Sequence, residues 1–139
     1  MSFPFNIRVY GILEASGSVL LSTENYAGRN FTKFPGGALE FGEGMRETIE
    51  REFMEETGLE VKAEKHIYTT DFFQVSAFNP NHQIVSVYYK VRFEGDTRLL
   101  ESIESLEGNH EFFWVELEKL SSEHLTFPID KHVCENYLT

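Results

Sequence analysis

Runs of β-branched and aromatic residues recur along the chain between turn-forming residues, in the way that is typical of β-strands. Segments 6–14 and 18–23 are rich in β-branched and aromatic residues and flank the sequence Ala-Ser-Gly, which predicts a hairpin. The Gly, Asn and Pro content of segment 25–37 predicts a loop. Four later segments have strand patterns, with a turn at 79–82 between the second and the third: 60–68, 70–78, 83–94 and 111–117.

The pattern changes to a helical period from Met45 to Thr57, and Gly58 is placed to end this helix. Segments 118–124 and 128–138 alternate as short helices do, with Pro128 marking the start of the second. This order of elements predicts an α/β fold in which helices cover the faces of a mixed sheet. Because the 139 residues contain no repeat, low-complexity tract or linker, we expect one domain over residues 1–139.

Negative charge is concentrated at the edge of the apolar face of the predicted helix. The apolar stripe consists of Met45, Ile49 and Phe53. Three glutamates lie along its border: Glu52, Glu55 and Glu56. Carboxylates in this position repel one another and resist desolvation, and Arg51 can reach only part of the cluster. Mg²⁺ or Mn²⁺ is the natural counter-ion because hard divalent ions take oxygen ligands, although a solvated helix with i,i+4 ion pairs is the alternative interpretation.

The spacing of these residues follows a longer pattern that spans Gly37 to Leu59. It reads Gly, five residues, Glu, seven residues, then Arg-Glu-apolar-any-Glu-Glu-any-Gly-apolar. The matching positions are Gly37, Glu43, Arg51, Glu52, Phe53, Glu55, Glu56, Gly58 and Leu59. This segment resembles the Nudix box of the Nudix hydrolase family. The order of the flanking sequences, Phe-Pro-Gly-Gly before it and Phe-Phe-Trp-Val-Glu-Leu well after it, extends the resemblance to most of the chain.

The resemblance implies a Nudix-type α/β/α sandwich with a mixed β-sheet, in which the box forms a loop-helix-loop. It also implies hydrolysis of a diphosphate linkage with Mg²⁺ or Mn²⁺ as the cofactor. Four metal ligands are implied: Glu52, Glu55, Glu56 and the carbonyl of Gly36. Glu52 and Glu55 are also the candidates for positioning or deprotonating the attacking water. Glu43 and Arg51 join this catalytic set through an ion pair that is expected to anchor the loop and orient the glutamates.

Substrate-binding candidates lie outside the acidic helix. Arg29 and Lys33 are candidates for a phosphate contact, and Phe34 is a candidate for stacking on a nucleobase. The segment Phe-Pro-Ile-Asp-Lys-His-Val resembles the place where some nucleotide-hydrolysing relatives carry a base-contacting residue, which makes Asp130 a candidate. Glu107, ahead of the predicted strand that carries Trp, is the candidate for an additional acid. His82 and His110 are interpreted as bystanders.

The formal net charge of −11 argues against a nucleic-acid polymer or an anionic membrane as the main partner. The first residues lack the basic and apolar regions of a signal peptide, and no stretch is apolar enough to span a bilayer. The only cysteine, Cys134, cannot close an internal disulfide. We therefore expect a cytoplasmic protein with a small-molecule nucleotide or nucleoside diphosphate derivative as its partner, and a homodimer is left open.

The leading hypothesis is a Mg²⁺-dependent hydrolase. It would cleave a diphosphate linkage in a nucleoside triphosphate or another nucleoside-diphosphate-linked substrate by attack of a metal-activated water on phosphorus. A Nudix-fold nucleotide sensor that binds without turnover is the alternative, and the retention of every glutamate of the box counts against it. An isomerase of the Nudix-related isopentenyl diphosphate type ranks last, because that chemistry requires a placed cysteine and Cys134 lies near the C-terminus.

Overall fold

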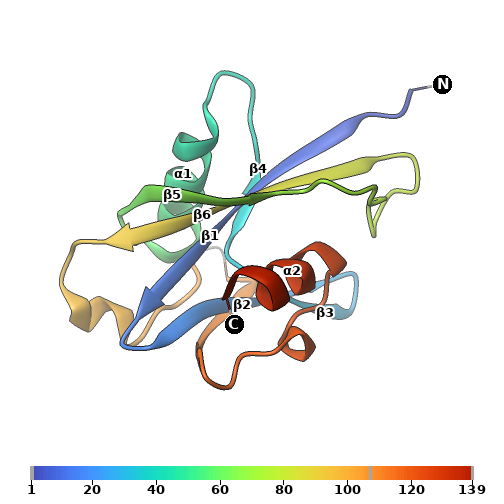
Figure 1. The fold of residues 1–139 in the computed structure, drawn as a ribbon. Helices are drawn as coiled ribbons and strands as arrows, with labels where there is room; N and C mark the ends of the chain where they lie inside the picture. The colour runs from blue at the N-terminus through green and yellow to red at the C-terminus, as the bar shows by residue number, and fades with distance from the viewer. Residues whose placement is uncertain (1, 107, 139) are drawn as a thin grey trace.

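A mixed β-sheet forms the centre of the molecule (Figure 1). The computed structural model describes residues 2–106 and 108–138. The strands are β1 (Phe5–Ala15), β2 (Ser18–Tyr26), β3 (Arg29–Lys33), β4 (Gly36–Ala38), β5 (Val61–Thr69), β6 (Gln83–Phe93) and β7 (His110–Glu116). The helices are α1 (Met45–Thr57), the 3₁₀ turns η1 (Thr97–Leu100) and η2 (Ser122–His124), α2 (Pro128–Val133) and the π-helical turn η3 (Cys134–Leu138).

The strands follow the order β3-β2-β1-β6-β5, while β4 pairs with β1 and β7 pairs with β2. Among the strand pairs of the described residues, β1 and β6 are parallel to each other and the others are antiparallel. β1 and β2 pair only beside their turn, at Glu14 with Val19 and Ala15 with Ser18. Beyond these residues β4 lies next to β1 and β3 lies next to β2, so the two halves of the sheet diverge.

Side chains on β1 alternate between two hydrophobic cores. Val9 packs with Phe53 of α1 on one face of the sheet, and Tyr10 packs with Val133 of α2 on the other. Figure 1 accordingly shows α1 on one side of the sheet and α2 with η3 on the other. The expected α/β/α sandwich with a mixed sheet is therefore confirmed. Gly11 permits the close approach of α1, because a Cβ there would lie 2.5 Å from the Phe53 ring.

Two tight turns shape the N-terminal half of the sheet. Ser16 and Gly17 both have positive φ, as a type I′ turn requires, and the predicted first hairpin is confirmed. Ala27 and Gly28 repeat this geometry between β2 and β3. The prediction of a loop over 25–37 is therefore wrong for β3 and β4. Of the residues that suggest a loop, only Gly28 lies in the hairpin turn, whereas Asn25 and Asn30 pair with each other across β2 and β3. Gly36 and Gly37 belong to β4.

The segment 70–78 is not a strand, although its aromatic content predicts one. Within it only Val75 forms a β-bridge, to Gln83. The ring of Phe78 instead contacts aromatic side chains at 5.2–6.3 Å between ring centres: Tyr26, Phe31 and Phe127. The apolar residues of this segment thus cover other side chains rather than a neighbouring strand. The predicted helix at 118–124 is likewise reduced to a turn followed by η2.

The predicted bounds of α1 are confirmed. Glu47 accepts a hydrogen bond from the backbone N–H of Gly44 at the start, and Gly58 ends the helix with a φ of 76°. Within the described ranges no helix is long and apolar enough to cross a membrane.

Candidate active site

Arg51 fastens the loop before α1 to the helix itself. Its Nε and Nη2 donate to the two carboxylate oxygens of Glu43 over 3.0 and 2.7 Å, and Nη2 also donates to the carbonyl of Ala38 over 3.0 Å. The guanidinium lowers the pKa of the Glu43 carboxyl to about 2, and the carboxylate in turn raises the pKa of Arg51. The expected ion pair between these two residues is present, in the bidentate form that also fixes orientation.

The remaining Arg51 nitrogen binds two of the candidate metal ligands. Nη1 donates to Oε1 of Glu52 over 2.9 Å and to Oε2 of Glu55 over 3.2 Å. Burial raises the pKa of Glu52, and the attraction of Arg51 offsets this only in part. Glu55 keeps half of its side chain exposed to solvent. Arg51 therefore reaches two members of the acidic cluster and holds them on one side of α1.

Glu56 is the buried member of the cluster, with 3% of its surface exposed. Its Oε1 lies 3.5 Å from Nε2 of His110, and the same nitrogen lies 3.5 Å from Oε2 of Glu24 on β2. Glu24, and to a smaller extent Glu56, raise the pKa of His110. The buried ring of His110 thus connects α1 to β2, while its interpretation as a bystander to the substrate stays a prediction.

The carboxylates of the cluster point to different partners. Arg51 holds Glu52 and Glu55, while Glu56 faces His110. Accordingly, in residues 2–106 and 108–138 no group of three acidic, histidine or cysteine side chains surrounds a common metal position. The candidate ligands still fit a hard divalent cation, because the carboxylates and the Gly36 carbonyl provide only oxygen atoms. In addition, Glu52 is partly buried, and Arg51 offsets only part of the resulting rise in the pKa of its carboxyl. Such an ion would compete with Arg51 for Glu52 and Glu55.

Two glycines of β4 leave room for close contacts, one with the backbone of β1 and the other with a glutamate of the acidic cluster. A Cβ on Gly36 would lie 2.1 Å from the carbonyl oxygen of Val9 on β1, and its φ of 154° also disfavours a side chain. A Cβ on Gly37 would lie 2.5 Å from Oε1 of Glu52. Gly36 is thus required by the backbone of the sheet, whereas Gly37 makes room for a candidate ligand.

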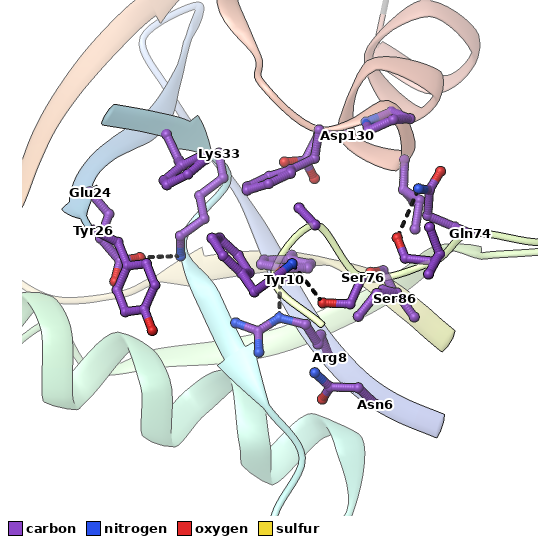
Figure 2. A pocket seen from close by; sticks show the side chains of 18 of the residues that line it. Asn6, Arg8, Tyr10, Glu24, Tyr26, Lys33, Gln74, Ser76, Ser86 and Asp130 are labelled. Atoms are coloured by element: carbon purple, nitrogen blue, oxygen red, sulfur yellow. Dashed lines mark hydrogen bonds and ion pairs between the residues drawn. The ribbon is translucent and has the colours of Figure 1, made fainter. Parts of the chain in front are cut away.

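A cavity of about 290 Å³ opens where β1 and β2 diverge (Figure 2). Its floor includes alternate residues of β1, namely Asn6, Arg8 and Tyr10, beside Ile84, Ser86 and Tyr88 of β6. Aromatic side chains from four different segments line it: Tyr26, Phe31, Phe78 and Phe127. Loop residues 74–78 and the start of α2 complete the lining. The cavity thus combines flat apolar walls with a few polar groups, as small-molecule sites do.

Asp130 marks the end of the cavity at α2. It is 2% exposed, and its Oδ1 accepts a hydrogen bond from the Tyr88 hydroxyl. Burial raises the pKa of Asp130 to about 6, even though Lys33 and Arg8 attract its negative charge.

Of the five substrate-binding candidates, two line the cavity: Lys33 and Asp130. The Nζ of Lys33 lies 3.8 Å from Oε2 of Glu24, and Asp130 lines the cavity from α2. Arg29 does not line the cavity and is exposed, with its guanidinium 5.4 Å from the centre of the Phe31 ring. The prediction for Phe34 is wrong, because this ring is completely buried in the core against Tyr88 and cannot reach a ligand. Glu107 lies outside the described residues.

Three residues of the cavity lining that the sequence did not single out are Arg8, Tyr10 and Glu24. A signal for Arg8 was present, since it is the only charged residue from Phe5 to Leu13, and burial of an arginine requires a partner.

Comparisons with known proteins agree with this architecture. A family model described as NUDIX domain matches residues 3–137. The E. coli ORF135 protein superimposes with a TM-score of 0.76 at 20% identity, covering 97% of this chain and 89% of that one. A MutT NUDIX hydrolase from Burkholderia pseudomallei gives 0.72 at 18% identity, with 96% and 98% covered. A MutT protein from Methanosarcina mazei Go1 gives 0.68 at 21% identity, with 86% and 82% covered. At these identities the structures support the fold, and the match to residues 3–137 shows that the chain belongs to the Nudix family.

Proposed function

We propose that this chain is a Mg²⁺- or Mn²⁺-dependent hydrolase of the diphosphate linkage in a nucleoside triphosphate or another nucleoside-diphosphate-linked substrate. Nudix hydrolases are generally pyrophosphohydrolases, which sets the reaction class. The observation that carries the proposal is the series of contacts from Glu56 through His110 to Glu24. Because Glu24 lines the cavity, these contacts join the acidic helix to a site that can hold the organic part of such a substrate.

Glu52, Glu55, Glu56 and the Gly36 carbonyl are the groups that would hold the ion. When bound, the ion neutralises charge on the phosphoryl oxygens and makes water a stronger acid. Arg51 donates to Oε1 of Glu52, and no described residue donates to Oε2. That oxygen is the proposed acceptor for a proton of the attacking water, with Glu55 as the other candidate. Arg51 and Glu43 act by positioning these carboxylates.

The nucleoside part of the substrate is proposed to occupy the cavity. Its aromatic walls suit a planar base, and Asp130 presents a carboxyl group at the end formed by α2. Lys33 provides a buried cation for a phosphate group.

The test is a hydrolysis screen with Mg²⁺ against nucleoside triphosphates, nucleoside diphosphate sugars and dinucleoside polyphosphates, with identification of the products. A nucleoside monophosphate with pyrophosphate would identify a triphosphate substrate, and two phosphate monoesters would identify a linked diphosphate. Cleavage should stop when the metal is chelated. Tight binding of a nucleotide with no cleavage of any anhydride would instead support the nucleotide-sensor alternative.

The two neighbouring glycines provide a matched pair of variants. Gly37→Ala places a methyl group against the movable Glu52 carboxylate, so kcat should fall about tenfold or more while the melting temperature stays nearly unchanged. Gly36→Ala places its methyl against the β1 backbone, so the melting temperature itself should fall. Thermal denaturation and initial rates measure both effects. Equal losses of stability in the two variants would contradict the assigned role of Gly37.

A further inference from the structure

Arg8 is a cation in the cavity wall with unused hydrogen-bonding capacity. Its Nε donates to the Tyr10 hydroxyl over 2.7 Å. Across residues 2–106 and 108–138, its Nη1 and Nη2 atoms have no hydrogen-bond or ion-pair partner. The guanidinium is thus held by one edge, while the nitrogens that suit bidentate binding of an anion remain available.

Lys33, the other cation of the cavity lining, has more of its charge neutralised by a neighbouring carboxylate than Arg8 has. Lys33 forms an ion pair with Glu24, whereas the hydrogen-bond partner of Arg8 is an uncharged phenol. Arg8 Cζ and Lys33 Nζ lie 5.8 and 5.7 Å from the centre of the Tyr10 ring, so both cations approach the same part of the cavity. Figure 2 shows both side chains beside Tyr10, with Asp130 further toward α2. In a chain with a net charge of −11, this local positive charge favours an anion.

The position of Arg8 relates the cavity to the acidic helix. Arg8 pairs with Ala38 in the register of β1 and β4, and the preceding residue of β4, Gly37, lies against the Glu52 carboxylate. Tyr10, followed more weakly by Glu52 and Glu24, raises the pKa of Arg8. Arg8 therefore lies between the aromatic part of the cavity and the candidate metal ligands.

We infer that Arg8, oriented by Tyr10, binds the phosphate group attached to the nucleoside, so that the cavity selects nucleotides over unphosphorylated nucleosides. This inference rests on the proposed function for the identity of the ligand. A nucleoside held by the aromatic walls would direct its 5′-phosphate toward the acidic helix, and Arg8 lies on that route. Arg8 is thus a specificity residue, and Tyr10 acts through it as a positioning residue.

The test compares binding of the four common ribonucleosides and their 5′-monophosphates by calorimetry, with EDTA present. The wild-type protein should bind at least one monophosphate about tenfold or more tightly than its nucleoside, as expected for a charge-assisted hydrogen bond. Arg8→Gln should reduce this preference to about twofold or less without weakening nucleoside binding. Tyr10→Phe, which keeps the ring but removes the acceptor for Nε, should give an intermediate preference. Arg98→Gln, at an exposed arginine of η1 outside the cavity lining, is the control and should leave it unchanged.

The inference is overturned if the wild-type protein does not prefer any monophosphate, or if Arg8→Gln retains the preference. Because these measurements need neither metal nor turnover, they separate the inference from the proposed function. Hydrolysis by the wild-type protein together with an unchanged preference in Arg8→Gln would refute the inference alone. An Arg8-dependent preference in a protein that cleaves no anhydride would refute the proposed hydrolase alone.

Discussion

Glu56→Gln is expected to lower kcat by about 10²- to 10⁴-fold, the range found when a group that stabilises charge or moves a proton in the transition state is removed. Glu56 is the most buried acid of the cluster, and glutamine preserves its shape but removes the charge that a divalent ion would require. The variant should stay folded, because the side chain retains an oxygen that faces His110. Steady-state kinetics at saturating Mg²⁺ on the substrate found by the screen measures the effect.

Glu60→Gln is the matched control for this variant. Glu60 lies just beyond α1, is exposed, and has no side-chain interaction with any described residue. It should retain the wild-type kcat within about twofold, since surface substitutions of this kind have small effects. A Glu56→Gln protein with a near-normal kcat would refute the assignment of Glu56 to the metal site.

Asp130→Asn is expected to stabilise the protein at pH 8 by up to about 3 kcal/mol, the free energy that corresponds to the shift of the Asp130 pKa from 3.8 to about 6. The folded state binds this proton more tightly than the unfolded state, because burial disfavours the carboxylate. Protonation of Asp130 therefore adds stability as the pH falls through about 6 toward 3.8, and this stability is lost above about 6. Asparagine cannot ionise and still accepts the hydrogen bond from Tyr88. The gain in stability should therefore disappear near pH 4, where Asp130 of the folded wild-type protein is also uncharged.

Chemical denaturation at pH 8, 6 and 4 measures this effect. Asp71→Asn is the control, because Asp71 also accepts a hydrogen bond from a tyrosine, Tyr68, but is exposed to solvent. It should show no comparable gain at pH 8. A stability difference between Asp130→Asn and wild type that does not change with pH would show that the buried carboxyl does not titrate in this range.

The parts of the fold that depend on local signals were predictable. Helix α1 has an apolar stripe, a capping glutamate and a terminal glycine within one continuous segment, and its predicted bounds agree with the structure. The segment 70–78 shows the limit of such signals. Its aromatic residues resemble those of a strand, but Phe78 packs on Tyr26, Phe31 and Phe127, all of which are far from Phe78 in the sequence. Tertiary contacts therefore override the local preference in this segment.

The candidate site also has a part that the sequence could predict and a part that depends on tertiary structure. The resemblance of one continuous segment to the Nudix box implied the ion pair between Glu43 and Arg51, and the structure contains it. The cavity depends instead on where β1 and β2 separate, which no local pattern specifies. The isolated charge of Arg8 in β1 indicated a buried partner, but the sequence did not place Arg8 in this cavity. Phe34 was misassigned because an aromatic residue near the box suits a base contact and a core position equally well, and its packing against Tyr88 decides for the core.

Binding of Mn²⁺, followed by electron paramagnetic resonance in the absence of substrate, tests most directly whether α1 carries a metal site. The wild-type protein should bind Mn²⁺ in competition with Mg²⁺, and Glu52→Gln and Glu56→Gln should each weaken this binding by about tenfold or more. Glu60→Gln should bind as the wild type does. Equal Mn²⁺ affinity in all four proteins would contradict the account, because the acidic face of α1 would then hold no catalytic ion.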